Sequence, residues 1–243
     1  MSWVGIKSEV LDLYLSTKGF AVCKAGRLEC TRDSEGIEAT FAALAQWLEK
    51  APTRARLNVF FSAGLCRPFL MAQLPPLNPH ETERALQSAA LKRTGLGGPC
   101  EVWIDPMEGA GKRVAAAVEL SVLQKLQALP RLVGKRHKLL SAQPLWSEWL
   151  RIALHKDPRA ACVVLQECDA VTVLSGDADQ YDIATTVVRG AQDSVTTEAV
   201  ARLLLTVDLE TRPAMQGLAV LHGSSGLAEE LKSVLSPVLE VTA

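Results

Sequence analysis

This sequence has no large excess of charge of either sign, no long apolar run and no targeting segment. Lys and Arg (26) nearly balance Asp and Glu (27), and the basic residues are scattered, which excludes the basic stripe of a nucleic-acid-binding protein. The longest apolar runs, such as Val114–Val118 and Ala161–Leu165, have the length of strands and are too short to cross a bilayer. No basic start followed by an apolar run is present, so we expect a cytosolic protein without membrane insertion.

Clustered metal ligands are missing as well. The six cysteines lie far apart with no C-x-x-C pair, and the four histidines show no ligand spacing with them or with one another. A zinc site needs such a cluster, so we expect no metal and interpret the cysteines as reduced, buried thiols. The cysteines are Cys23, Cys30, Cys66, Cys100, Cys162 and Cys168, and the histidines are His80, His137, His155 and His222.

The residues that are present predict a globular α/β chain. Apolar residues make up 48% and charged residues 22% of 243 positions, which is enough to build a sizeable core. Near the start, three strand-like stretches are separated by turns at Lys18-Gly19 and Ala25-Gly26. An amphipathic helix from Ile37 to Leu48 and a buried strand, RLNVFFSAG, follow them.

The same order of elements returns near the end of the chain. Three strands, a helix, a strand, a second helix and a closing strand follow one another. Because no sequence repeat is detectable, we infer duplication from this order alone. The strands are AACVVLQE, AVTVLSGD, DIATTVVRG, GLAVLHG and VLEVT, and the helices carry Val200, Leu203, Leu204 and Val207, then Leu227, Leu231, Val234 and Leu235.

An inserted block at about residues 66–120 separates the two halves. Its strand CRPFLMAQLPPL precedes a helix that Asn78, Pro79 and Glu81 predict to start, as cap, first-position proline and reciprocal glutamate. Gly95 is expected to end this helix. The strands CEVWIDPME and RVAAAVEL come next, joined by the turn EGAGK, which lacks Walker spacing and is interpreted as a hairpin.

A helix, a strand and a further helix complete the first half. Ser121 is expected to open the first of these helices and Pro130 to end it. The strand HKLLSAQP leads into a helix with Trp146 and Trp149 on one face, which we expect to be buried. Trp103, on an insert strand, is instead a candidate to face a groove as an anchor for a partner.

This order of elements resembles the actin-like ATPase fold, an α/β fold of duplicated RNase H-like halves. The position of the insert resembles the FtsA-type arrangement, shared by PilM of type IV pilus systems and the cytoplasmic GspL domain of type II secretion. The similar stretches are FLMAQLPPLNPHETERALQSAALKRT, LLSAQPLWSEWLRIAL and LAVLHGSSGLAEELKSVLSPVLEV. The resemblance covers essentially the whole chain, and it implies a first half of residues 1–157 and a second half of residues 158–243.

The sequence departs from this family at two nucleotide-binding turns, where an Asp-x-Gly motif is expected. At the first turn, the alignment puts Lys7 in place of the acidic residue, and a lysine cannot hold Mg²⁺. At the second, the chain offers Leu165 and Gln166 and no glycine, so backbone amides cannot approach a phosphate closely. We therefore expect two of the three nucleotide contacts to be lost, and we expect no cofactor.

The third contact is the turn formed by Gly223, Ser224, Ser225 and Gly226, and it has two interpretations. As a vestigial nucleotide turn, it would contact a phosphate or adenosine at a helix N-terminus. As a plain corner, it would need flexible glycines and use a serine as the helix cap. The glutamates at positions 229 and 230 already complement the positive helix end, which favours the corner. The turn is also one residue short of a hydrolase G-x-S-x-G motif.

The resemblance and the lost turns together predict a non-catalytic actin-like scaffold. It would lie on the cytoplasmic side of a type IV pilus or type II secretion platform, peripheral to the inner membrane through its partners. PilN-like or GspM-like membrane proteins and the assembly ATPase are the partners that the resemblance implies. A chain that ends at Ala243 favours a PilM-like protein over GspL, which continues into a membrane helix. The alternatives are an active actin-like ATPase and a filament-forming cytoskeletal protein.

Overall fold

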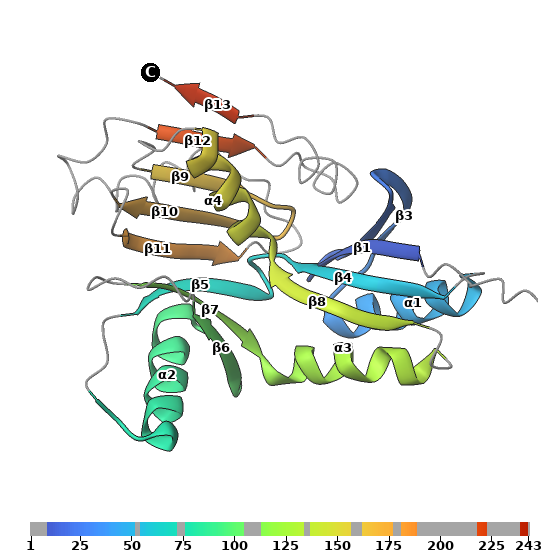
Figure 1. The fold of residues 1–243 in the computed structure, drawn as a ribbon, viewed down its shortest axis with the longest axis horizontal. Coiled ribbons are helices and arrows are strands. Elements are labelled where there is room, and N and C mark those ends of the chain that lie inside the picture. Colours follow the sequence, from blue (N-terminus) through green and yellow to red (C-terminus); the bar gives the residue numbers. More distant parts are fainter. Residues whose placement is uncertain are drawn as a thin grey trace, which may run out of the picture.

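The computed structural model describes residues 9–51, 54–71, 76–104, 113–133, 137–156, 162–176, 181–188, 218–222 and 239–242. The strands in these ranges form two five-stranded sheets and one three-stranded sheet (Figure 1). Within the same ranges, no helix is long and apolar enough to span a membrane.

The first sheet has the strand order β3-β2-β1-β4-β8. Strands β1 to β3 form an antiparallel meander, whereas β4 runs parallel to β1 and β8 parallel to β4. Both predicted turns are confirmed, because Thr17-Lys18 and Ala25-Gly26 separate the three strands of the meander. The bounds are β1 Glu9–Ser16, β2 Gly19–Lys24, β3 Arg27–Asp33, β4 Ala55–Phe61 and β8 Lys138–Pro144.

Helices α1 (Ile37–Lys50) and α3 (Leu120–Leu132) pack together below the first sheet in the view of Figure 1. Helix α1 buries Phe41, Leu44 and Leu48 at helical spacing, as its sequence predicts. On β1, alternate leucines at positions 11, 13 and 15 are at most 5% exposed, which is the period of a strand. Apolar spacing therefore fixes the main core between this sheet and its two helices.

Helix α3 differs from its prediction at both ends. Its N-cap is Glu119 rather than Ser121, and no side-chain hydrogen bond caps it. Pro130 lies inside the helix, so the expectation that it ends the helix is wrong by two residues. Leu129 and Val133 are both buried, and the Val133 N–H donates to the Leu129 carbonyl, so core packing holds the last turn.

The second sheet repeats the strand order of the first, as β11-β10-β9-β12-β13. The two sheets therefore share one strand order. The likeness is not complete, because β13 runs antiparallel to β12 whereas β8 runs parallel to β4. Helix α4 (Leu145–Lys156) contacts strands of both sheets, and its Trp146 and Trp149 are buried as predicted. The bounds are β9 Cys162–Gln166, β10 Ala170–Gly176, β11 Tyr181–Val188, β12 Leu218–His222 and β13 Leu239–Thr242.

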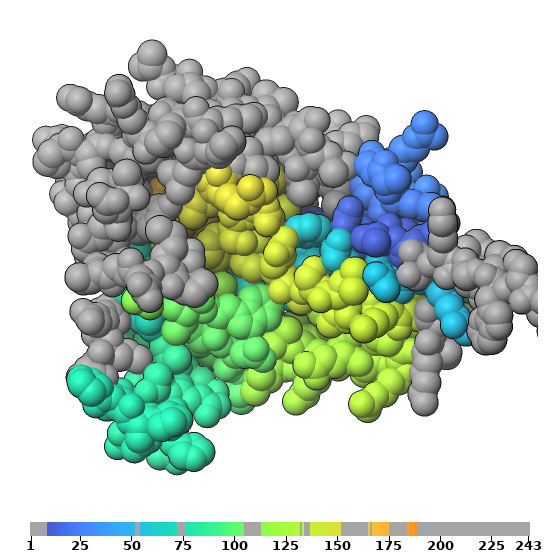
Figure 2. Space-filling model, viewed as in Figure 1, coloured from blue at the N-terminus to red at the C-terminus, as the bar shows by residue number. Residues whose placement is uncertain are grey.

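The three-stranded sheet, in the order β5-β7-β6, carries helix α2 and projects from the rest of the molecule (Figures 1 and 2). Its elements follow the predicted strand–helix–strand–strand order. Asn78 and Glu81 form the predicted capping box, and Gly95 ends α2 in the left-handed conformation with φ of 66°. The bounds are β5 Cys66–Met71, α2 Pro79–Thr94, β6 Cys100–Ile104 and β7 Arg113–Glu119.

Candidate functional site

Three turns meet between the first and second sheets, and we call the region where they meet the cleft. The first turn joins β1 to β2 at Thr17-Lys18, and the second follows β4 at residues 62–65. The third joins β9 to β10 and carries Glu167, Cys168 and Asp169. The Glu167 and Asp169 side chains are 1% and 0% exposed, so these carboxyl groups lie in the interior of the molecule.

Asp169 is held by three donors of the first sheet. Its Oδ2 accepts hydrogen bonds from the Thr17 N–H at 2.8 Å, the Thr17 hydroxyl at 2.9 Å and the Ser62 hydroxyl at 2.8 Å. These are hydrogen bonds of ordinary length. Its Oδ1 is buried and has no hydrogen-bond partner among the described residues.

Glu167 makes the second set of contacts. Its Oε2 accepts from the Ala63 N–H at 2.8 Å, and its Oε1 accepts from the Tyr14 hydroxyl at 3.4 Å. The Glu167 N–H donates to the Ala170 carbonyl at 2.8 Å, which closes the turn that presents both carboxylates. The turn from the second sheet therefore inserts its two acidic side chains between donors of the first sheet.

Gly64 makes this close approach possible. A Cβ added to Gly64 would lie 2.7 Å from the Asp169 Cγ, closer than real Cβ contacts. Gly19 has a different role, because its φ of 139° and its missing side chain allow β3 to pass beside it at the Arg32 carbonyl. Of these two glycines, only Gly64 serves the cleft.

Burial dominates the electrostatics of the cleft. It raises the pKa of Asp169, and the donors to its carboxylate oppose that rise. Burial, and to a smaller extent the charge of Glu167, raises the pKa of the Cys66 thiol well above its ordinary value. Burial lowers the pKa of the half-buried Arg67, against the opposite influence of Glu119 and Asp169. Within the described residues, no three His, Cys, Asp or Glu side chains are placed to hold a metal ion.

The first turn that faces the cleft is not the one that the sequence alignment chose. The central strand of the first sheet is β1, and the turn after it is Thr17-Lys18, so the assignment of the first phosphate turn to Lys7 is corrected. Lys7 itself lies outside the described residues. The alternation of leucines along β1 was the signal that could have placed this turn.

The second turn follows β9, and the residues that make its contacts lie beyond Leu165 and Gln166. Leu165 and Gln166 end β9, and Glu167 and Asp169, which follow at once, make the contacts. Two acidic residues in a tight turn between apolar strands were the available signal. The third candidate turn, at Gly223, Ser224, Ser225 and Gly226, lies outside the described residues, and both of its interpretations stay open.

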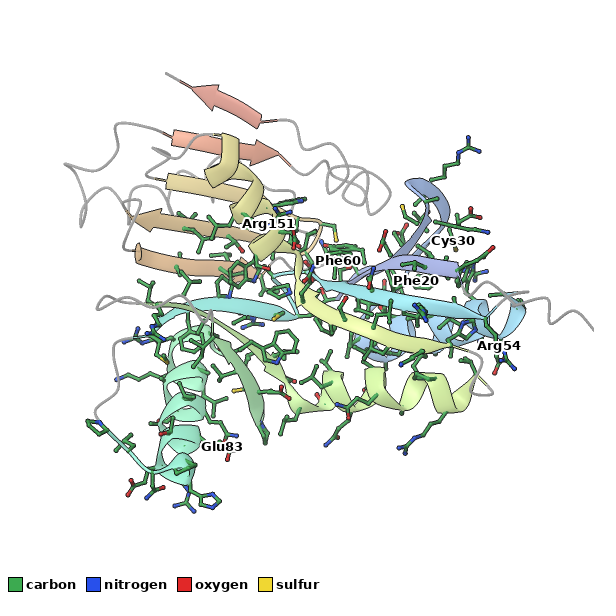
Figure 3. All side chains as sticks on the ribbon, viewed as in Figure 1. Phe20, Cys30, Arg54, Phe60, Glu83 and Arg151 are labelled. Atoms are coloured by element: carbon green, nitrogen blue, oxygen red, sulfur yellow. The ribbon has the colours of Figure 1, made fainter. Side chains whose placement is uncertain are left out.

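A groove between α2 and β6 is the second candidate site. It has a volume of about 610 Å³, and Leu86, Val102 and Leu120 contribute apolar surface to it. The carboxylates of Glu83 and Glu101 also line it, and Glu83 projects from the side of α2 that faces β6 (Figure 3). Strand β6 forms one edge of its sheet. An apolar floor, two carboxylates and an edge strand together suit an extended peptide.

Trp103 does not line this groove. Its indole N–H donates to Glu101 at 2.8 Å, and its ring packs against Phe61 with ring centroids 6.2 Å apart. Trp103 is half-buried against the main core. The prediction of an anchor for a partner is therefore not supported at Trp103, and the groove is lined by its neighbours Glu101 and Val102 instead.

No protein-family model and no curated protein matches the sequence. Solved structures do match the fold. A Bacteroides thetaiotaomicron protein with actin-like ATPase fold and unknown function shares 12% identity, at a TM-score of 0.57, over 87% of this chain and 80% of its own. A PilM–PilN type IV pilus biogenesis complex shares 16% identity, at a TM-score of 0.51, over 93% and 86%.

The cytoplasmic domain of EpsL, an inner-membrane component of the type II secretion system of Vibrio cholerae, is also similar. It shares 15% identity, at a TM-score of 0.47, over 74% of this chain and 71% of its own. Identities of this size show a common fold, and function has to be argued from the residues of this chain. The chain is an α/β protein with mixed sheets whose fold is like that of actin-like ATPase fold proteins.

Proposed function

We propose that this protein is a non-catalytic scaffold on the cytoplasmic side of a bacterial type IV pilus or type II secretion platform. The cleft carries the first part of this proposal. The donors that face the cleft from the first sheet already bind Glu167 and Asp169, so a phosphate group placed there would meet two carboxylates and no free donor of this set. Because like charges repel strongly in a buried site, this arrangement disfavours a nucleotide.

The groove between α2 and β6 supports the second part, which concerns the partner. A short cytoplasmic tail of a PilN-like or GspM-like membrane protein would lie in the groove as an extended peptide. Its apolar side chains would cover Leu86 and Val102, and its basic side chains would face Glu83 and Glu101. The similarity of the fold to that of a PilM–PilN type IV pilus biogenesis complex supports a partner of this kind. The assembly ATPase is a further partner in this proposal.

A peptide-binding experiment tests this proposal. Synthetic peptides would cover the cytoplasmic tails of the PilN-like and GspM-like proteins of the same organism, and their binding would be followed by fluorescence anisotropy. We expect one peptide to bind, and Glu83→Lys to weaken its binding about tenfold, or 1.4 kcal/mol, through charge repulsion. The matched control is Glu49→Lys on the exposed side of α1, which should bind as the parent does.

The other outcomes separate the alternatives. If neither tail binds, the scaffold proposal fails in its present form. If a tail binds equally well to the Glu83→Lys and Glu49→Lys variants, the partner docks elsewhere than the groove. A filament-forming protein would instead scatter light increasingly as its concentration is raised.

A further inference from the structure

We infer that the turns of the first sheet form a binding site for a small carboxylate, and that the Asp169 side chain is the built-in ligand of this site. We call the three donors to Asp169 the oxyanion site: the N–H group and the hydroxyl of Thr17 and the hydroxyl of Ser62. They come from two turns that lie far apart in the sequence, and all three donate to the Asp169 Oδ2 at 2.8–2.9 Å.

The donor on the turn after β4, the Ser62 hydroxyl, belongs to a residue that is held by bonds that do not involve the carboxylates. The Ser62 N–H donates to the Leu15 carbonyl at 2.8 Å, which ties this turn to the end of β1. The Ser62 carbonyl accepts from the N–H groups of Leu65 and Cys66 at 3.0 and 2.8 Å. We therefore expect Ser62 to keep its position when the Asp169 carboxylate is removed.

The donors on the turn after β1 are fixed in the same way. The Ser16 hydroxyl donates to the Gly19 carbonyl and accepts from the Lys18 N–H, each at 3.1 Å. The Thr17 carbonyl accepts from the Gly36 N–H at 3.0 Å. Because both turns are pre-organised by the first sheet, removal of the Asp169 carboxylate leaves a formed site rather than a collapsed one.

The surroundings favour an anion of carboxylate size. The site is buried, so an unoccupied donor there cannot be satisfied by bulk water and is costly. Gly64 has no side chain to exclude the Asp169 carboxylate, and Asp169 is one of the charges that oppose the lowering of the Arg67 pKa.

Chemical rescue tests the inference. Asp169→Ala removes the built-in carboxylate, and sodium formate supplies one of matching size. The midpoint of denaturant unfolding is measured in formate and in sodium chloride at equal ionic strength. We expect Asp169→Ala to unfold at a lower midpoint than the parent in chloride, and formate to recover at least a third of the difference in a saturable way. The parent should respond equally to the two salts.

Asp12→Ala is the matched control. Asp12 also accepts a hydrogen bond, from Asn58 at 3.0 Å, but it is half-exposed on the face of the first sheet. Formate should therefore give this variant no more stability than chloride does. An equal response of Asp169→Ala to the two salts, or an equal gain in both variants, overturns the inference.

If Asp169→Ala does not fold in chloride, the yield of refolded protein in the two salts is compared instead. A higher yield in formate supports the inference, and equal yields contradict it. The double variant Asp169→Ala with Ser62→Ala should lose the rescue, because it removes one of the donors that the formate would use. Rescue that persists unchanged in the double variant also contradicts the inference.

Discussion

The cleft and the groove use their polar groups in opposite ways. In the cleft, two carboxylates are at most 1% exposed, and donors of the same chain face them. In the groove, two carboxylates lie beside apolar side chains of α2 and β6, and α2 buries only Ala90 fully. The carboxylates of the cleft are bound within the chain, whereas the groove can receive a partner. This difference directs the search for a partner to the groove and away from the cleft.

The largest expected effect comes from a single methyl group in the cleft. Gly64→Ala places a Cβ against the Asp169 carboxylate, and the neighbouring turns are fixed by their own hydrogen bonds. Overpacking of this kind should lower the free energy of unfolding by about 1–3 kcal/mol. Gly98→Ala is the matched control, because nothing lies within 4 Å of the added Cβ, and it should change stability by less than about 0.5 kcal/mol. Urea unfolding of both variants measures the contrast, and equal effects would show that the cleft is not tightly closed.

A smaller effect is expected at the N-terminus of α2, which borders the groove. Helix α2 buries little apolar surface, so its capping box contributes a large part of its local stability. Asn78→Ala removes the acceptor of the Glu81 N–H and should cost about 1 kcal/mol. The same change at Ser121, which caps no helix, should cost less than about 0.5 kcal/mol. Denaturant unfolding, with hydrogen exchange of the α2 amides, tests both values, and an unchanged Asn78→Ala variant would mean that the cap does not hold the helix.

The smallest expected effect is a pH dependence of the cleft. Burial raises the pKa of Asp169 above its ordinary value of 3.8, so the folded state binds this proton more tightly than the unfolded state does. Its contribution to stability is therefore complete below about pH 3.8 and is lost as the pH rises through the raised pKa. Relative to Asp169→Asn, which does not titrate, the parent should lose stability over this range.

Unfolding free energies of the parent and Asp169→Asn, measured between about pH 4 and 7, give this difference directly. Glu167, Cys66, Arg67 and Tyr14 are the other titratable groups of the cleft, and both proteins contain them. Their titration contributes nearly equally to both proteins, so it largely cancels in the difference between the two unfolding free energies. A difference that stays constant with pH would show that Asp169 titrates normally.

Local features of the fold could be predicted from the sequence. The turn before β2, predicted one residue late, and the turn at Ala25-Gly26 follow from local patterns in the sequence. So do the capped start of α2 and the buried pair Trp146 and Trp149. The end of α3 could not be predicted, because burial of Leu129 and Val133 outweighs the local preference of a proline. The direction of β13 depends on the chain path and not on its own residues.

The cleft could not be predicted from any motif. Thr17, Ser62 and Asp169 are far apart in the sequence and are common residue types, so only the pairing of strands brings them together. The sequence did show that phosphate-binding glycines are missing from the turn after β9. It did not show that Glu167 and Asp169 point inward rather than to solvent, because acidic residues in a turn are usually exposed.

Titration of the purified protein with Mg-ATP, followed by isothermal calorimetry, tests most directly whether the cleft is closed to nucleotides. Because Glu167 and Asp169 already use the donors that face the cleft, we expect no saturable heat even at millimolar Mg-ATP. A dissociation constant in the micromolar range would contradict this expectation. The protein would then be an actin-like nucleotide-binding ATPase rather than a scaffold.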